Sequence, residues 1–203
     1  MKSGQPASKG ASDQPRKKVL FICSGNYYRS RLAEILFNHE AAAAGLAWES
    51  ASRGLLKTGE LKGISEHTVN YLKGAKLAHL VEEPRNPLAV DVEELTEADL
   101  TIALCREEHQ PLIEQKFLAL ARALRKAGRI RYWNIYDIPG RPHAIVRFLG
   151  GGHRGPSQPA ESGTEHIALA VKKLVDELSE ARPRQSEITE PPQKSRRAIF
   201  LWS

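Results

Sequence analysis

The order of predicted strands and helices along the chain is typical of an α/β domain. Four short apolar segments, each long enough for a buried strand, alternate with four segments that have the periodicity of an amphipathic helix. Such alternation predicts a three-layer fold, in which parallel strands form one sheet and helices cover both of its faces. The length of 203 residues fits one domain, and 41% apolar residues suffice for a buried core, which excludes wholesale disorder.

The first strand and helix are the most clearly marked pair. The run Lys-Val-Leu-Phe-Ile-Cys at residues 18–23 has the length of a buried strand and stops at a Ser-Gly-Asn turn signal. The helix begins at Arg29 and ends at Gly45. Its apolar and polar side chains fall on opposite faces. The apolar face has Leu32, Ile35, Leu36 and Ala43, and the polar face has Arg31, Glu34 and Asn38.

The later elements repeat this alternation. They are strand 48–52, a short helix after the N-cap Ser65 with Val69 and Leu72 on its inner face, strand 100–104, helix 107–126, strand 130–135 and helix 164–178. The acidic, proline-containing stretch 82–98 and the Gly/Pro-rich stretch 138–163 are predicted to be loops. A loop as long as the second one is usually functional or disordered.

The positive charge of the chain lies in its ends. Residues 1–18 carry five basic side chains and one acidic, and residues 181–203 carry five and two. Since the whole chain has a net charge of +6, the part between these ends is close to neutral. We therefore expect disordered basic tails at 1–16 and 181–203 around one domain at 17–180. A nucleic-acid-binding surface would instead concentrate charge on the domain, so nucleic acid is not an expected partner of the core.

Composition also predicts the cellular setting. The chain has no run of about 18 apolar residues, so no transmembrane helix and no membrane contact are expected. Its first residues lack the apolar region of a secretory signal. The two cysteines, Cys23 and Cys105, cannot form a disulfide framework. A reducing, cytoplasmic location is therefore the expectation.

The loop between the first strand and the first helix has the composition of an anion site. In parallel sheets the active site lies at the carboxyl ends of the strands, where Cys23 is expected. Backbone N–H groups of a loop before a helix N-terminus, together with the helix dipole, bind a dianion such as phosphate. Gly25 lets the backbone approach the anion closely. The planar fork of Arg29 can bind two phosphate oxygens.

The same loop contains a nucleophile. Cys23 would lie in this positive field, which is expected to lower the pKa of a thiol below its free value of about 8.5 and leave a thiolate at neutral pH. A thiolate beneath a bound phosphoryl group can attack phosphorus. Ser30 is placed to donate a hydrogen bond to the sulfur and to make it a better leaving group in a second step. These residues predict the two-step hydrolysis of a phosphate monoester.

The sequence from Val19 to Ser30, VLFICSGNYYRS, resembles the signature of the low-molecular-weight protein tyrosine phosphatase family, whose usual form is Val-Leu-Phe-Val-Cys-x-Gly-Asn-x-x-Arg-Ser. The similarity in element order extends to about Leu178. The resemblance implies a flavodoxin-like, four-stranded parallel sheet, a phosphocysteine intermediate, and no metal or cofactor. It also implies roles for four residues and a phosphate-binding loop. Cys23 is the nucleophile, Arg29 the phosphate clamp, Asn26 the brace of the loop and Ser30 the partner of the sulfur, and the loop consists of Ser24, Gly25, Asn26, Tyr27, Tyr28 and Arg29.

The family also uses a general acid, which protonates the leaving oxygen. In the family this is the Asp of an Asp-Pro pair on a late loop. Asp137 is the only acidic residue between positions 130 and 160, and it follows the fourth predicted strand, so it is the candidate. One residue separates it from Pro139. If the family's Asp corresponds to Gly140 instead, the acid is absent.

The substrate is less clearly indicated than the chemistry. Family members that act on phosphotyrosine have aromatic residues after the Asp-Pro pair, whereas residues 140–143 are Gly, Arg, Pro and His. Tyr27 and Tyr28 can line the mouth of the site in their place, or can pack beneath the loop. The expected partner is therefore a phosphorylated protein or a phosphorylated small molecule.

Two other functions fit parts of the pattern. A phosphate- or phosphoprotein-binding module with little turnover would keep the anion cradle, although it would not need the thiol. An arsenate reductase of the same fold would need two further cysteines for its disulfide relay. Only Cys105 is available, and it is expected to be a small buried hydrophobic residue.

The remaining polar residues give weaker expectations. The seven histidines do not have metal-ligand spacing, and those on or beside predicted helices are expected to be solvated. These are His39, His67, His79 and His109. Arg53 follows the second strand, so it can face either the site or the surface.

Overall fold

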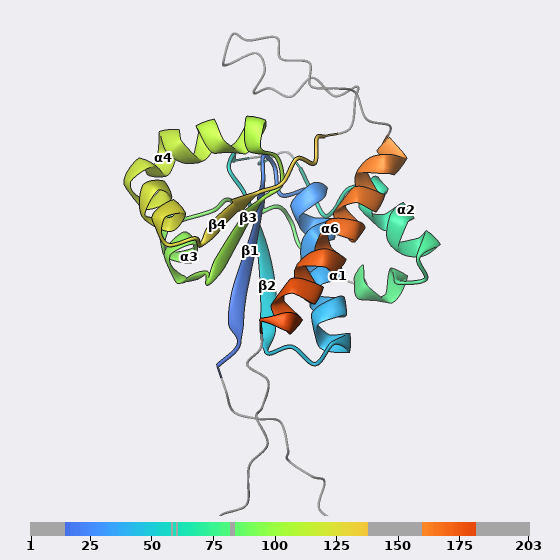
Figure 1. Ribbon diagram of the computed structural model, residues 1–203. Helices are drawn as coiled ribbons and strands as arrows, with labels where there is room; N and C mark the ends of the chain where they lie inside the picture. Colours follow the sequence, from blue (N-terminus) through green and yellow to red (C-terminus); the bar gives the residue numbers. More distant parts are fainter. Residues whose placement is uncertain (1–14, 58, 60, 82–83, 138–159, 182–203) are drawn as a thin grey trace, which may run out of the picture.

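The computed structural model describes residues 15–57, 59, 61–81, 84–137 and 160–181 (Figure 1). Four parallel strands form one sheet in the order β2-β1-β3-β4, which confirms the predicted fold class. The strands are β1 (Lys17–Cys23), β2 (Trp48–Gly54), β3 (Leu100–Ala103) and β4 (Ile130–Tyr132). Among the described residues, no helix is both long and apolar enough to cross a membrane.

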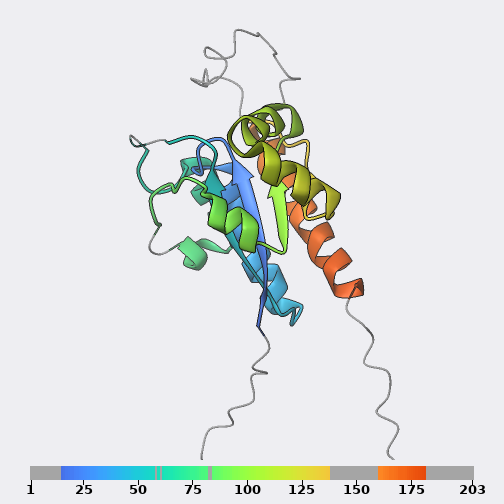
Figure 2. The same ribbon diagram turned by 90° about the vertical axis from the view of Figure 1, so that its left-hand side faces the viewer.

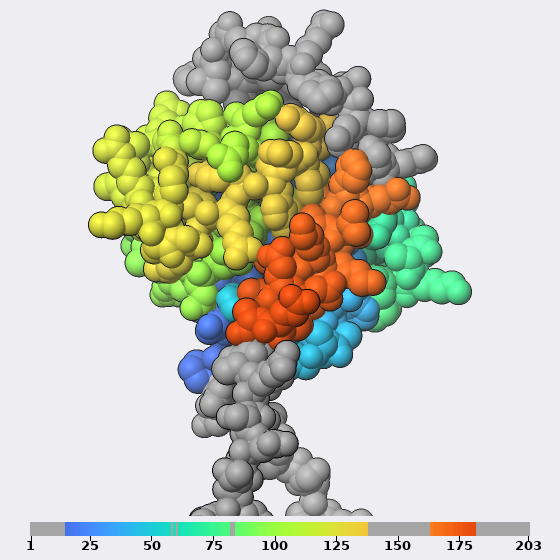
Figure 3. Space-filling model, in the orientation of Figure 1, coloured from blue at the N-terminus to red at the C-terminus, as the bar shows by residue number. Residues whose placement is uncertain are grey.

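Helices cover both faces of the sheet (Figures 1 and 2). The helices are α1 (Arg29–Ala43), α2 (Glu66–Gly74), α3 (Val92–Glu97), α4 (Arg106–Lys126) and α6 (Ala160–Glu180), with a 3-10 turn η1 at Ala78–Val81. Alternate residues of β1 face opposite layers. Phe21 packs in one core with side chains of α1 and α6, and Ile22 in a second core with side chains of α3 and α4. In the space-filling view α6 lies between the β4–α4 part of the surface and α1 with α2 (Figure 3).

Three differences from the predicted elements exceed two residues. The β4 strand ends at Tyr132 rather than at residue 135, because the chain leaves the sheet there and Asn134 forms an antiparallel bridge with Cys105. The stretch 82–98 contains α3, for which the Asp91 side chain is the N-cap and accepts a hydrogen bond from the Glu94 N–H at 2.8 Å. The final helix begins at Ala160, so the predicted loop ends earlier than expected.

The polar face of α1, which the sequence placed opposite the apolar one, is partly covered. Arg31 is buried, and together with Leu80 and Val81 of η1 it lines a cleft on this side of the helix. Of the two residues expected on the inner face of α2, Leu72 is buried, whereas Val69 is only half-buried and Thr68 is buried instead. The predicted tails at 1–16 and 181–203, and the stretch 138–159, lie almost entirely outside the described residues.

The ends of β1 and β2 meet where the site is expected. The register pairs Cys23 with Gly54, so both strands end at the loop of residues 24–28. A Cβ on Gly54 would lie 3.0 Å from the carbonyl carbon of Gly25 and 3.1 Å from the Asn26 nitrogen. Only glycine therefore allows β2 to lie this close to the loop without a backbone shift.

Candidate active site

The Cys23 sulfur lies at the base of the loop that joins β1 to α1. The Asn26 N–H donates a hydrogen bond to Sγ at 3.2 Å, and the Ser30 hydroxyl lies 3.0 Å from the same sulfur. Both contacts are buried. The structure therefore brings Cys23 and Ser30 together as the sequence predicts.

Asn26 ties the loop to its surroundings through both ends of its amide. Its Nδ2 donates to the hydroxyls of Ser30 at 3.1 Å and Ser52 at 2.8 Å. Its Oδ1 accepts from Arg85 and from the Leu88 N–H, both at 2.9 Å. The residue is fully buried and has a φ of 51°, a left-handed conformation that Asn tolerates better than most residues. This geometry is what a brace of the loop requires.

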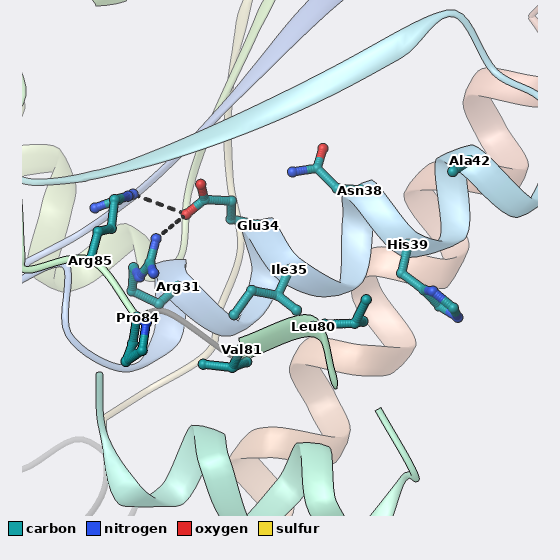
Figure 4. A pocket seen from close by; sticks show the side chains of 10 residues that line it. All are labelled: Arg31, Glu34, Ile35, Asn38, His39, Ala42, Leu80, Val81, Pro84 and Arg85. Carbon is teal, nitrogen blue, oxygen red and sulfur yellow. Dashed lines mark hydrogen bonds and ion pairs between the residues drawn. The ribbon is translucent and has the colours of Figure 1, made fainter. Parts of the chain in front are cut away.

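Arg85, which donates to Asn26, belongs to a cluster of two arginines and one glutamate (Figure 4). Arg85 and Arg31 both donate to the Glu34 carboxylate, at 3.0 and 2.8 Å. Arg85 also donates to the backbone and side-chain oxygens of Ser52. Burial, together with the neighbouring arginines, lowers the pKa of Arg85, and Glu34 opposes that shift. Arg31, Glu34 and Arg85 line a cleft of about 560 Å³, whose other walls include Leu80, Val81 and Pro84.

The Arg29 guanidinium, predicted to clamp phosphate, is held by α4 and by the chain after β4. Its Nη1 donates to Glu108 Oε1 at 3.1 Å and to the Ile135 carbonyl at 3.0 Å. Its Nη2 donates to Glu108 Oε2 at 2.7 Å. The Arg29 side chain is only 2% exposed, so the guanidinium is enclosed and does not extend into solvent.

Asp137 reaches the same guanidinium. Its Oδ2 lies 3.5 Å from Nη2 of Arg29, and its side chain is 22% exposed. Burial alone would lower the pKa of Arg29, but the carboxylates of Asp137 and Glu108, together with Cys23, raise it, and the net shift is upward. The structure thus brings Asp137 to Arg29, and the Cys23 sulfur lies near enough to act on the charge of that guanidinium, while Gly140 lies outside the described residues.

His109 is buried, which corrects the expectation that it is solvated. Its Nδ1 accepts a hydrogen bond from the Cys105 N–H at 3.0 Å, so in the neutral ring the proton is on Nε2. Nε2 lies 3.3 Å from Ser24 Oγ and can donate to it. Because α4 begins one residue after Cys105, this histidine joins the start of α4 to the phosphate loop.

The other cysteine and one loop tyrosine lie in apolar surroundings. Cys105 is fully buried, and burial first, then Glu108, raises the pKa of its thiol to about 11, as expected for a small hydrophobic residue. Tyr28 packs in the α1–α6 core, and burial, followed by Asp137, raises its pKa to about 12. Its hydroxyl has no hydrogen-bond partner within the described part of the chain. Tyr28 therefore packs beneath the loop, whereas Tyr27 is half-buried.

Several residues of this site were missed by the sequence analysis. Glu108, Arg85 and Ser52 contact the loop from distant parts of the chain, and no local pattern marks them. Arg53, which the sequence left open, forms an ion pair with Glu94 of α3. Among the described residues, no group of three or more His, Cys, Asp or Glu could hold a metal ion.

Comparison with known proteins gives a family match. The family model described as low molecular weight phosphotyrosine protein phosphatase matches residues 18–138, which is more than half of the chain. None of the curated proteins compared with the chain is significantly similar to it.

Solved structures share the fold at low sequence identity. A low molecular weight protein tyrosine phosphatase from T. tengcongensis is 22% identical, with 79% of this chain and 99% of that chain covered and a TM-score of 0.57. YfkJ from Bacillus subtilis is 19% identical, with coverages of 86% and 99% and a TM-score of 0.59. An arginine phosphatase, YwlE from Geobacillus stearothermophilus, is 18% identical, with coverages of 84% and 98% and a TM-score of 0.57.

Proposed function

The chain belongs to the low molecular weight protein tyrosine phosphatase family and is therefore a cysteine-dependent phosphatase, and we propose that it hydrolyses phosphate monoesters through a phosphocysteine on Cys23. The observation that carries this proposal is the position of the Cys23 sulfur. It accepts a hydrogen bond from a backbone N–H of the loop and lies beside the Ser30 hydroxyl, just before the N-terminus of α1. A sulfur so placed can meet a phosphoryl group that the loop amides and Arg29 hold.

In the first step the Cys23 thiolate attacks phosphorus. The S–P bond forms and the bond from phosphorus to the leaving oxygen breaks. Asp137 donates its proton to that oxygen, because an unprotonated alkoxide or phenoxide leaves poorly. Arg29 and the loop amides bind the equatorial oxygens, where negative charge is concentrated.

In the second step water attacks the phosphocysteine. Asp137, now ionised, accepts a proton from the water as the new P–O bond forms and the S–P bond breaks. The hydrogen bonds from Asn26 and Ser30 stabilise the departing thiolate. We expect a bell-shaped dependence of the rate on pH, because the first step needs ionised Cys23 and protonated Asp137.

The carboxylates beside Arg29 favour a second candidate for the leaving group. Asp137 and Glu108 both lie next to the phosphate clamp and are partly exposed. A cationic leaving group, such as the guanidinium of a phosphoarginine, would complement them electrostatically. One of the similar solved structures is that of an arginine phosphatase. The two candidates are compared by measuring kcat/KM for an aryl phosphate and for phosphoarginine. A higher value for phosphoarginine would favour the cationic leaving group.

The function is tested with an aryl phosphate and three proteins: the parent, Cys23→Ser and Asp137→Asn. We expect turnover by the parent, near-total loss in Cys23→Ser, and in Asp137→Asn a fall of about 10²–10⁴-fold for a poor leaving group. Phosphate binding by the parent without turnover would instead identify a binding module. Unchanged activity of Asp137→Asn would refute the role of that residue alone.

We also propose a reducing, cytoplasmic location, which the two free cysteines support.

A further inference from the structure

We infer that Glu108 is a positioning residue of the phosphate clamp, whose carboxylate orients the Arg29 guanidinium so that one edge of it faces the substrate phosphoryl group. The inference rests on the proposed function and adds a residue from α4 to the site. Glu108 contacts both Nη atoms of Arg29, at 3.1 and 2.7 Å. Such bidentate pairs between arginine and carboxylate fix orientation as well as supplying energy.

The hydrogens of the guanidinium show which edge is left for substrate. Nη1 uses both of its hydrogens, one on Glu108 and one on the Ile135 carbonyl, and Nη2 uses one on Glu108. Within the described residues, no hydrogen bond is made by Nε or by a second hydrogen of Nη2. In a planar guanidinium these two N–H groups lie parallel on one edge. That edge matches two oxygens of a phosphoryl group, and Asp137 lies beside it at 3.5 Å from Nη2.

Glu108 is itself held in place. It lies in the first turn of α4, where the Arg106 N–H donates to the Trp133 carbonyl at 2.9 Å. The next residue, His109, contacts Ser24 of the phosphate loop. The Glu108 side chain is 28% exposed while that of Arg29 is 2% exposed, so Glu108 closes the guanidinium on its outer side. A carboxylate on a helix anchored at both these points can define the orientation of Arg29.

A simple charge argument predicts the opposite effect, and this makes the inference testable. Glu108 is an anion close to where a phosphate dianion binds, so repulsion alone would make its removal strengthen phosphate binding. If Glu108 positions the clamp, its removal lets the guanidinium rotate, and phosphate binding weakens. A misplacement of about 1 Å in such a group can cost about 10²-fold in rate.

The experiment measures the affinity for inorganic phosphate by calorimetry, together with kcat and KM for an aryl phosphate. It compares the parent with Glu108→Ala and Glu108→Gln, which keeps one acceptor oxygen. The control is Glu114→Gln, which removes another glutamate of α4 from an ion pair with an arginine, Arg125, away from the site. We expect the alanine variant to bind phosphate about tenfold or more weakly, the glutamine variant to be intermediate, and the control to be unchanged. Thermal unfolding verifies that each variant folds, and the glutamine variant serves if the alanine variant does not.

A direct readout of orientation is the NMR spectrum of the guanidinium. Nη hydrogens held by Glu108 give separate, slowly exchanging signals for Arg29, and in both Glu108 variants we expect these signals to broaden and merge. Phosphate affinity equal to or higher than that of the parent in Glu108→Ala would overturn the inference. Because calorimetry needs no turnover, a parent that binds phosphate but does not hydrolyse the ester would contradict the proposed function and leave this measurement decisive.

Discussion

Replacement of Asn26 by alanine tests how much the phosphate loop depends on one side chain. The buried amide makes three hydrogen bonds with neutral partners and one with the Arg85 guanidinium. A neutral hydrogen bond contributes about 1 kcal/mol net and one to a charged group about 1.5–3 kcal/mol. Alanine at a φ of 51° adds about 1 kcal/mol of strain. Since Arg85 keeps its bonds to Glu34, we expect a loss of about 3–5 kcal/mol in the free energy of unfolding.

The assay is urea unfolding at neutral pH, with phosphate binding measured under the same conditions. The matched control is Asn38→Ala in α1. Asn38 also makes several hydrogen bonds, all to Ser50, but it is exposed and helical, so water replaces them and we expect a loss below about 1 kcal/mol. We further expect phosphate binding to be lost in Asn26→Ala and kept in the control. Equal losses of stability in the two variants would refute the reasoning, because burial and backbone conformation would then contribute nothing.

Two more substitutions test the packing around the loop. Gly54→Ala places a Cβ about 3.0 Å from the loop backbone, so we expect kcat/KM for an aryl phosphate to fall by about tenfold. The control is Gly74→Ala, whose Cβ would have nothing within 4 Å and should leave kcat/KM unchanged. A fully active Gly54→Ala would show that the loop can move. Tyr28→Phe removes a buried hydroxyl without a partner among the described residues, so stability to urea should rise or stay the same at neutral pH. Because burial raises the pKa of Tyr28 from 10.0 to about 12, the unfolded chain ionises first and stability falls across that interval as pH rises. The Phe variant should lack this contribution, and an identical alkaline decline in both proteins would contradict it.

The fold was predictable because its signals are local. The apolar run before Cys23 marks β1. Gly45 and Gly128, both with positive φ, follow the ends of α1 and α4, and the Ser65 side chain caps the start of α2. Short elements have weaker signals. The α3 helix has only six residues within an acidic stretch and was predicted to be loop, and β4 has only three, so its end was predicted too late.

The site was predictable only where it is contiguous in sequence. Residues 23–30 hold the sulfur, the loop amides, the guanidinium and the serine within one turn and the start of one helix. Glu108 and Arg85 join them through tertiary packing, and an acidic or basic residue on a helix or loop usually faces solvent. The prediction that His109 is solvated is wrong for the same reason. Its burial follows from hydrogen bonds to Cys105 and Ser24, which only the three-dimensional structure shows.

The most direct measurement of the proposed chemistry is the identification of the covalent intermediate. The protein is mixed with an aryl phosphate, quenched with denaturant within the first turnovers, and digested for mass spectrometry. We expect one phosphoryl group on the peptide that contains Cys23, and none in Cys23→Ser treated in the same way. Hydrolysis that proceeds without any phosphorylated Cys23, or a phosphoryl group on another residue of the active parent, would contradict the assignment of this sulfur as the nucleophile.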